Sequence, residues 1–172
     1  RQRQMCIRDR TCFDFTEEKL LEIARTAKET GVELFVLDDG WFGERSNEHA
    51  GLGDWFANTK RLPQGITGLS KKIGEIGMKF GLWFEPEMVN KDSDLYRQHP
   101  DWIIAAPERR QSHGRFQYVL DFSRTEVVDY IYSMMETLLS DADISYIKWD
   151  MNRSITECFS NTLPADRQGE VY

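Results

Sequence analysis

The chain has few cysteines, and their spacing is irregular. Cys6, Cys12 and Cys158 have neither an even count nor the spacing of metal ligands, so the sequence predicts no disulfide framework and no cysteine metal site. We expect free thiols, which favour a reducing compartment, and therefore a cytoplasmic protein. No signal peptide is visible in the sequence, which agrees with this expectation.

Positive charge and long apolar runs are also scarce. The net charge of the 172 residues is -7, so the chain lacks the basic patches that nucleic-acid binding needs. It has no run of about 18 apolar residues, so we expect no membrane span. What is present, with 40% hydrophobic and 30% charged residues, is an ordinary globular composition with enough apolar residues for one core.

Extended and helical segments alternate along the chain. Apolar runs are expected to be strands, and segments with apolar residues three and four apart are expected to be helices. The alternation predicts right-handed βαβ units around a parallel sheet, and hence an α/β fold. The expected strands cover residues 33–39, 78–85, 116–121 and 144–150, and the expected helices cover residues 16–31, 69–77, 92–98 and 123–138.

The expected strands end in acidic residues. Asp38 and Asp39 close the first strand, Glu85 the second, Asp121 the third and Asp150 the fourth. The carboxyl ends of parallel strands lie on one edge of a sheet, which in a (β/α)₈ barrel is the active-site face. We therefore predict that these carboxylates, far apart in the sequence, converge on one functional edge. The alternative is a set of solvated strand ends.

The stretch from Ile144 to Arg153 carries the most specific chemistry. It predicts a buried strand followed by polar groups, with Lys148 and Asp150 on the same face because they are two residues apart. A neighbouring cation favours the ionised carboxylate and lowers its pKa. Asp150, followed by Asn152, is therefore a candidate nucleophile or electrostatic stabiliser. A structural salt bridge explains the same pattern, and both interpretations stay open at this point.

Tryptophans lie near several of the acidic strand ends. Carboxylates accept hydrogen bonds from sugar hydroxyls, aromatic faces cover the apolar side of the ring, and glycoside hydrolysis needs two carboxyl groups. Trp41 and Trp83 are the best-placed candidates, although a tryptophan in a strand is more often a core residue. Arg115 has the fork geometry to grip a substrate hydroxyl or an aspartate, with a surface arginine as the alternative.

A divalent-metal site built from the same carboxylates is the competing interpretation. Oxygen ligands of this kind suit Mg²⁺ or Ca²⁺. Zinc is disfavoured, because His49, His99 and His113 all lie in expected loops rather than at strand ends. Composition alone does not separate the sugar site from the magnesium site.

Five motifs follow one another along the chain: FVLDDGWF (35–42), LGDW (52–55), GLWFEPEMV (81–89), HPDW (99–102) and YIKWDMNR (146–153). Together they resemble family 36 of the glycoside hydrolases, chiefly α-galactosidases of the melibiase and raffinose-degrading type. The resemblance implies a partial (β/α)₈ TIM barrel, roughly its first four βα units, formed by residues 13–172 and truncated at the C-terminus. Residues 1–12 are expected to be an N-terminal segment of doubtful structure.

The resemblance also implies site roles. Asp150 would be the nucleophile of a retaining double displacement on terminal α-linked galactose, as in melibiose and raffinose-type oligosaccharides. No metal and no other cofactor is expected for this chemistry. The sugar-binding positions that the resemblance implies are Asp38, Asp39, Trp83, Arg115, Lys148 and Asn152.

The chain departs from the family in three respects. Arg8 stands where the family has a tryptophan that helps line the pocket, and the family's large β-rich N-terminal domain is missing. The general acid/base aspartate of the family lies on a later strand, beyond Tyr172. We therefore expect the 172-residue chain by itself to be inactive and poorly stable, although the parent protein is an enzyme.

Several alternatives stay open from the sequence. The parent protein could prefer N-acetylgalactosamine, or transfer galactosyl groups instead of hydrolysing the bond. The domain could also be a non-catalytic sugar-binding module, although binding alone needs no nucleophile such as Asp150. Whether the parent is a homo-oligomer is left undecided.

Overall fold

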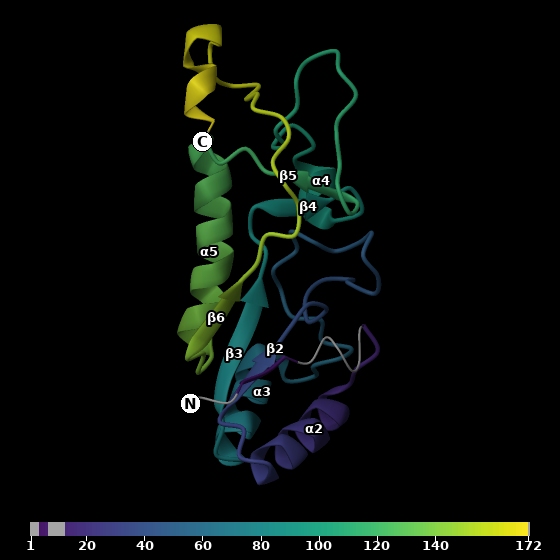
Figure 1. Ribbon diagram of the computed structural model, residues 1–172, viewed down its shortest axis with the longest axis vertical. Coiled ribbons are helices and arrows are strands. Elements are labelled where there is room, and N and C mark those ends of the chain that lie inside the picture. The colour runs from purple at the N-terminus through teal and green to yellow at the C-terminus, as the bar shows by residue number, and fades with distance from the viewer. Residues whose placement is uncertain (1–3, 7–12, 172) are drawn as a thin grey trace.

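The structure, a computed structural model, describes residues 4–6 and 13–171, with side chains described for residues 13–171. Its centre is a parallel sheet in which neighbouring strands follow the order β1-β2-β3-β6 (Figure 1). The strands are β1 (Gln4–Cys6), β2 (Leu34–Leu37), β3 (Lys79–Phe84) and β6 (Tyr146–Trp149). The predicted α/β fold with a parallel sheet is therefore confirmed.

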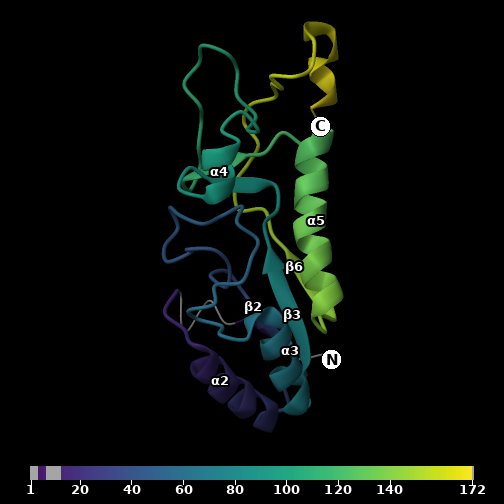
Figure 2. The ribbon, with the colours of Figure 1, turned by 180° about the vertical axis from the view of Figure 1, so that it is seen from behind.

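Three helices alternate with these strands. They are α2 (Glu17–Glu29), α3 (Gly65–Glu75) and α5 (Thr125–Asp141). Helix α3 packs against β3 and contacts both α2 and α5, and the views from front and back show the three helices beside the sheet (Figures 1 and 2). Helix α2 begins as its sequence predicts, because the Thr16 hydroxyl accepts a hydrogen bond from the Lys19 amide, and it ends before Gly31, whose φ is 85°.

The core is richest in aromatic rings at the carboxyl ends of β2 and β3. The four residues of β2 are all buried, as expected for an inner strand of a parallel sheet. Beyond them, Trp41, Trp55 and Trp83 are almost fully buried, with ring centroids 6.0 Å apart for both the 41–55 and the 55–83 pair. These three tryptophans are therefore core residues, as is more usual for a tryptophan at such a position. The site is therefore built on a rigid aromatic base.

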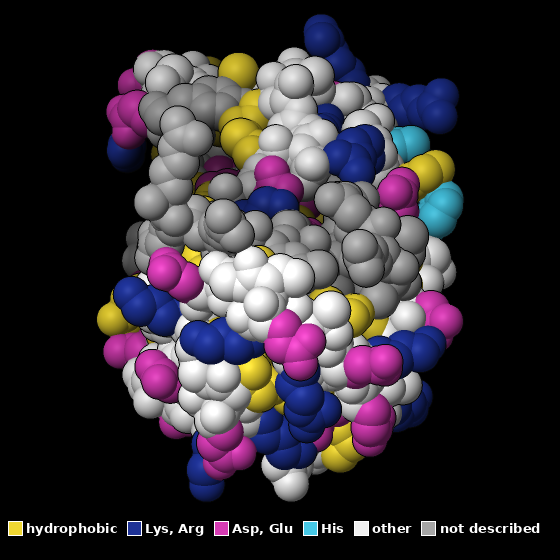
Figure 3. Space-filling view, turned by 60° about the horizontal axis from the view of Figure 1, so that its bottom comes forward, with side chains coloured by type: hydrophobic (Ala, Val, Ile, Leu, Met, Phe, Trp, Pro, Cys, Tyr) yellow, Lys and Arg dark blue, Asp and Glu magenta, His cyan; other side chains and the backbone are white. Residues whose placement is uncertain are grey.

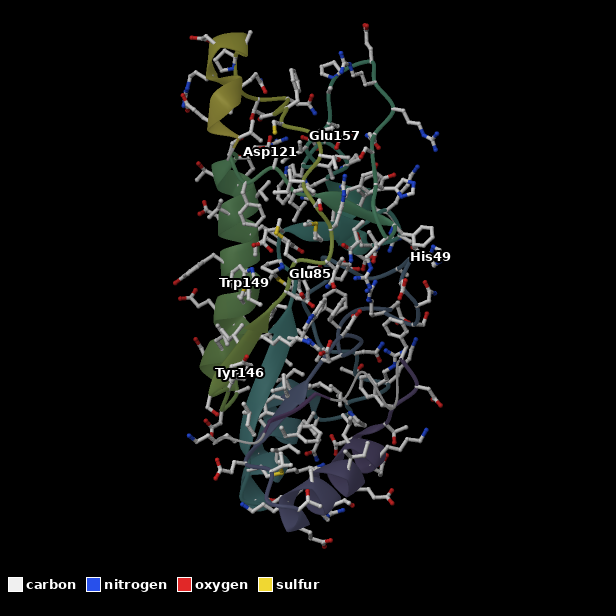
Figure 4. The ribbon with its side chains drawn as sticks, viewed as in Figure 1. His49, Glu85, Asp121, Tyr146, Trp149 and Glu157 are labelled. Atoms are coloured by element: carbon white, nitrogen blue, oxygen red, sulfur yellow. The ribbon has the colours of Figure 1, made fainter. Side chains whose placement is uncertain are left out.

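A small antiparallel unit interrupts the repeat between β3 and α5. It contains β4 (Met88–Asn90), helix α4 (Asp94–Gln98) and β5 (Gln117–Val119), with β4 and β5 paired antiparallel. The expected strand at 116–121 is thus extended, but it does not join the parallel sheet. The prediction that its acidic end, Asp121, converges with the other acids is wrong. Asp121 instead accepts hydrogen bonds from the hydroxyls of Ser123 and Ser160, and Figure 4 shows it well beyond Glu85.

Strand β6 corrects a second expectation. The sequence predicts a buried strand, but Tyr146, Ile147 and Trp149 are 39%, 36% and 55% exposed. The reason is position: β6 is an end strand of the described sheet, and β3 is the one strand with which it pairs. The apolar sequence of β6 is that of a buried strand, but at the edge of the sheet its side chains are not covered by a further element of the described chain (Figure 4).

The first strand was missed by the sequence pattern. Gln4–Cys6 pairs parallel with β2, whereas residues 1–10 predict no element. The positions of Arg8 and Cys12 lie outside the described residues, and Cys158 is an exposed free cysteine, as expected. Near the C-terminus, η1 (Ala165–Glu170) is a 3₁₀ helix. Among residues 4–6 and 13–171, no helix has both the length and the apolar character to cross a membrane.

Candidate active site

The carboxyl ends of β2, β3 and β6 bring four acids to one edge. Asp38 and Asp39 follow β2, Glu85 follows β3, and Asp150 follows β6. The register pairs Phe84 with Trp149, and the Asp150 amide donates to the Phe84 carbonyl at 2.9 Å, so Glu85 and Asp150 come out side by side. The predicted convergence of these four carboxylates is confirmed.

Asp150 is held by donors on both carboxylate oxygens. Its Oδ2 accepts a hydrogen bond from Trp83 Nε1 at 3.0 Å, and its Oδ1 accepts one from the Met151 amide at 3.0 Å. Partial burial by itself raises the pKa of this carboxyl. The hydrogen bonds from Trp83, Asn152 and Met151, together with the charge of Lys148, outweigh burial, so the pKa of Asp150 is lowered. Asp150 is therefore an ionised, partly accessible carboxylate.

Lys148 has a different direct partner from the expected one. Its Nζ lies 2.6 Å from Asp38 Oδ2, while Asp38 is almost fully buried and the lysine side chain is 34% exposed. The backbone amide of Asp39 donates to the other oxygen, Asp38 Oδ1, at 2.8 Å. Lys148 influences Asp150 through its charge rather than through a salt bridge. The alternative of a structural Lys148–Asp150 salt bridge is thus wrong, because the ion pair that forms crosses the sheet to β2.

Asp39 is clamped by an arginine that the sequence did not single out. Arg45 Nε and Nη2 donate to the two oxygens of Asp39, each at 2.8 Å, and both side chains are buried. Arg45 Nη1 also donates to Asn90 Oδ1 at 2.8 Å, which ties the end of β2 to β4. A bidentate pair of this kind fixes the carboxylate in orientation. No spacing rule in the sequence pairs residues six apart in a loop.

Glu85 is the most buried acid of the group, at 1% exposure. Burial is the main reason that the pKa of Glu85 is raised, and the nearby charges of Asp150 and Asp39 raise it further, while hydrogen bonds from Asn152 lower it. The Asn152 backbone amide donates to Oε1, and Gln117 Nε2 donates to Oε2 at 3.1 Å. Glu85 therefore anchors the segment that follows Asp150 to strand β5.

Arg115 joins the site from the antiparallel unit. Its Nη1 donates to Asn152 Oδ1 at 2.8 Å, and its backbone φ is 53°. Trp41 Nε1 donates to the Trp83 carbonyl at 3.0 Å, which holds the tryptophan that contacts Asp150. Direct contacts thus link all the predicted site residues into two groups at one edge. The groups are Asp150, Trp83, Asn152 and Arg115, and Asp38, Asp39 and Lys148.

The acids at this edge are paired with cations and donors that belong to the protein. Lys148 neutralises Asp38, and Arg45 neutralises Asp39. In the described part of the chain, no group of three histidine, cysteine, aspartate or glutamate side chains is arranged to hold a metal ion. Carboxylates already matched by lysine and arginine suit neutral hydroxyl groups better than a divalent cation.

The fold and site define a class of protein. A parallel α/β sheet whose carboxyl edge carries an ionised, accessible carboxylate, neutralised buried acids and an aromatic base has the features of a glycoside hydrolase. The Melibiase family model matches residues 5–172, and the chain belongs to this family.

Individual relatives agree with this assignment. The chain is 55% identical over 161 residues to Alpha-galactosidase AgaA of Geobacillus stearothermophilus, and 49% identical over 162 residues to Alpha-galactosidase Mel36A of Lactobacillus acidophilus. Each match covers 94% of this chain and 22% of the relative, so the chain spans about a fifth of the length of these relatives.

Solved structures are equally similar. The crystal structure of the GH36 α-galactosidase AgaA superimposes with a TM-score of 0.95 at 53% identity, covering 99% of this chain and 24% of that one. A substituted form of AgaA in complex with raffinose also gives a TM-score of 0.95, at 52% identity and the same coverage.

Proposed function

We propose that this chain is part of a retaining α-galactosidase that hydrolyses terminal α-linked galactose, with Asp150 as the nucleophile. The observation that carries the proposal is the Asp150 carboxylate, which is partly accessible and kept ionised by Trp83 Nε1 and the Met151 amide. The names of the relatives support galactose as the sugar, and the AgaA complex with raffinose supports raffinose-type oligosaccharides as substrates.

The reaction proceeds by double displacement. An Asp150 oxygen attacks the anomeric carbon and forms an ester bond while the glycosidic C–O bond breaks, and the departing oxygen takes a proton from a general acid. Water then attacks the same carbon and gives its proton to that group, now acting as a base. Galactose leaves, and Asp150 returns as a carboxylate.

The other site residues bind and orient the sugar. Asp38 and Asp39, neutralised by Lys148 and Arg45, keep lone pairs that can accept hydrogen bonds from galactose hydroxyls. Asn152 and Arg115 form a hydrogen-bonded pair beside Asp150, and their remaining N–H groups can donate to galactose hydroxyls. Trp83 holds Asp150 through its indole N–H and is otherwise buried in the core.

We further propose that the sheet is a partial (β/α)₈ barrel. Its parallel strands, its helices and its uncovered strand β6 are those of roughly four βα units. Residues 13–172 then form an incomplete catalytic domain, to which β1 adds residues 4–6. The general acid/base comes from a segment outside the 172 residues. This agrees with the state of the other edge acids, since Asp38, Asp39 and Glu85 are all engaged by neighbouring side chains or amides.

The test uses the complete protein that contains this chain. We expect Asp150→Asn to lower kcat on an aryl α-galactoside by roughly 10⁴-fold or more, the scale on which loss of a catalytic nucleophile or base acts in hydrolases. In Asp150→Gly, azide should restore turnover by attacking the anomeric carbon in place of the missing carboxylate. Full activity in a folded Asp150→Asn protein would refute the proposal.

A further inference from the structure

We propose that Phe116, His49 and His113 form an acceptor-side subsite, which binds the sugar unit attached to the terminal galactose. The inference rests on the proposed function and adds to it the part of the substrate that the site must hold beyond galactose. The juxtaposition that carries it is a strained turn with Arg115 in the candidate active site and Phe116 in a neighbouring pocket.

The turn spans Gly114 to Gln117. The Gln117 amide donates to the Gly114 carbonyl at 2.9 Å, and both central residues have positive φ, 53° for Arg115 and 61° for Phe116. Turns of this pattern favour asparagine and glycine, because other side chains are strained there. Strain of this kind is retained where a side chain is needed in a particular place.

The two strained residues contribute to adjoining regions. Arg115 bonds to Asn152, which belongs to the network around Asp150. The Phe116 carbonyl accepts a hydrogen bond from Asn90 Nδ2 at 2.9 Å, and Asn90 Oδ1 accepts one from Arg45, the partner of Asp39. The turn is therefore fixed to the acid-bearing edge at two points. A glycoside bound at Asp150 can extend from Arg115 along the chain to Phe116.

Phe116 lies at a pocket of about 520 Å³, a volume within the usual range for small-molecule sites. Phe116 is 45% exposed, and the centroid of its ring lies 3.6 Å from that of His49 and 6.0 Å from that of His113. Figure 4 labels His49 on the side of the molecule away from α5 and β6, and Figure 3 shows histidine side chains (cyan) beside hydrophobic ones (yellow) at the surface.

The remaining lining residues are polar or aromatic. They are Lys91, Asp92, Arg97 and Tyr118. Arg97 Nη1 donates to Asp92 at 2.7 Å, so these charges neutralise each other locally. Exposed rings beside paired charges and a lysine suit a neutral polyhydroxylated ring, whose apolar face packs on the aromatic groups while its hydroxyls meet the charged ends. This chemistry identifies the occupant as a hexose unit rather than an ion or an apolar group.

The experiment compares two substrates in the complete protein. Raffinose carries sugar units on the acceptor side, whereas α-galactosyl fluoride carries only a fluoride. Phe116→Asn removes the ring and suits the left-handed turn, and Phe116→Tyr keeps the ring. We expect Phe116→Asn to lower the ratio of kcat/KM for raffinose to that for the fluoride by about tenfold, the scale of one aromatic contact. We expect Phe116→Tyr to leave this ratio near its wild-type value.

Controls separate a subsite from a structural turn. Phe56 is also 45% exposed and is not among the residues lining the pocket, so Phe56→Asn should leave the ratio unchanged. His49→Ala, at an exposed position, should lower the ratio as well and serves if Phe116→Asn fails to fold. An equal loss on both substrates in these variants would overturn the subsite. Absence of wild-type turnover on both substrates would instead overturn the proposed function, and the subsite with it.

Discussion

At the residue scale, the two neighbouring acids at the ends of β3 and β6 have opposite pKa shifts. The pKa of Asp150 is lowered because its hydrogen bonds outweigh its partial burial, and the pKa of Glu85 is raised chiefly because it is buried. Environments that separate two carboxyl groups in this way commonly give them different roles. Here Asp150 is the accessible anion, and Glu85 is a buried positioning residue that holds the Asn152 amide.

Glu85 therefore makes stability depend on pH. An unfolded glutamate titrates near 4.5, and folding raises this pKa. Between the two pKa values the folded protein holds a proton that the unfolded chain has released. This group's contribution to stability is therefore largest below 4.5, falls as the pH rises through the raised pKa, and then levels off.

Glu85→Gln removes this dependence, because glutamine stays neutral. Its amide oxygen can still accept from Asn152, and its amide nitrogen can donate to Gln117 Oε1, which has no hydrogen-bond partner within the described residues. We expect the Tm of the variant in the complete protein to gain on that of the wild type as the pH rises from about 4.5 through the raised pKa of Glu85, because only the wild type loses stability there. Glu29→Gln, at an exposed position of α2, is the control. A Tm difference that is flat with pH would contradict the raised pKa.

The sequence predicts much of the site at this scale, although not its pairings. Lys148, Asp150 and Asn152 could be predicted as site residues, because an apolar run in the sequence shows where the strand ends. Lys148 pairs with Asp38 rather than with Asp150, because its long side chain reaches past β3, which lies between β6 and β2, to the end of β2. Arg45 was missed for a related reason, since its contacts depend on a loop conformation that no periodicity describes.

At the element scale, β6 and α5 share an uncovered apolar face. Ile147 and Trp149 of β6 line a groove of about 480 Å³ together with Val128 and Tyr132 of α5. Strand β6 is also an end strand of the described sheet, the position at which a sheet can take up another strand. In the complete protein, the proposed barrel covers this face with its next βα unit.

Ile147→Lys should therefore have opposite effects in the two proteins. In the 172-residue chain a lysine on the edge strand should reduce aggregation, measured as the fraction that stays in the supernatant after centrifugation. In the complete protein the proposed barrel would bury the same lysine, which should then cost about 1–3 kcal/mol of unfolding free energy, measured by urea denaturation. Thr67→Lys adds the same charge at an exposed position of α3 and should do neither. An Ile147→Lys complete protein as stable as the wild type would mean that β6 stays open.

Elements are predictable where their own pattern determines them. Helix α2 follows from its cap, its apolar spacing and Gly31, and the inner strands follow from their apolar runs. Strand β5 has the same extended pattern but pairs antiparallel with β4, and a pattern does not name its partner. Two of the five sequence motifs, LGDW and HPDW, make contacts within the fold. In LGDW, Asp54 accepts hydrogen bonds from the Asp94 and Leu95 amides at the start of α4. In HPDW, the His99 ring stacks on the Trp102 ring with their centroids 3.8 Å apart.

At the scale of the whole molecule, the lower face in Figure 3 and the side formed by α5 and β6 carry different kinds of side chains. Figure 3 shows Lys and Arg side chains interspersed with Asp and Glu over the lower face, which is the pattern of a solvated surface. The other side carries the exposed apolar residues of β6 and the groove beside α5. The composition predicts a globular chain with one core, but it does not predict this asymmetry, because an average does not record where the apolar residues lie.

This asymmetry leads to a prediction for the chain as a whole. The purified 172-residue chain should show no measurable turnover of an aryl α-galactoside, because the proposed general acid/base comes from outside it. It should also bind the dye ANS through the exposed groove beside α5, whereas the complete protein should bind little if the proposed barrel covers the groove with its next βα unit. Both proteins are assayed at equal concentration, with the Asp150→Asn complete protein as the folded, inactive control. Turnover by the purified chain would show that its own edge acids supply the proton, and Glu85, the acid with the raised pKa, would then be the first residue to substitute.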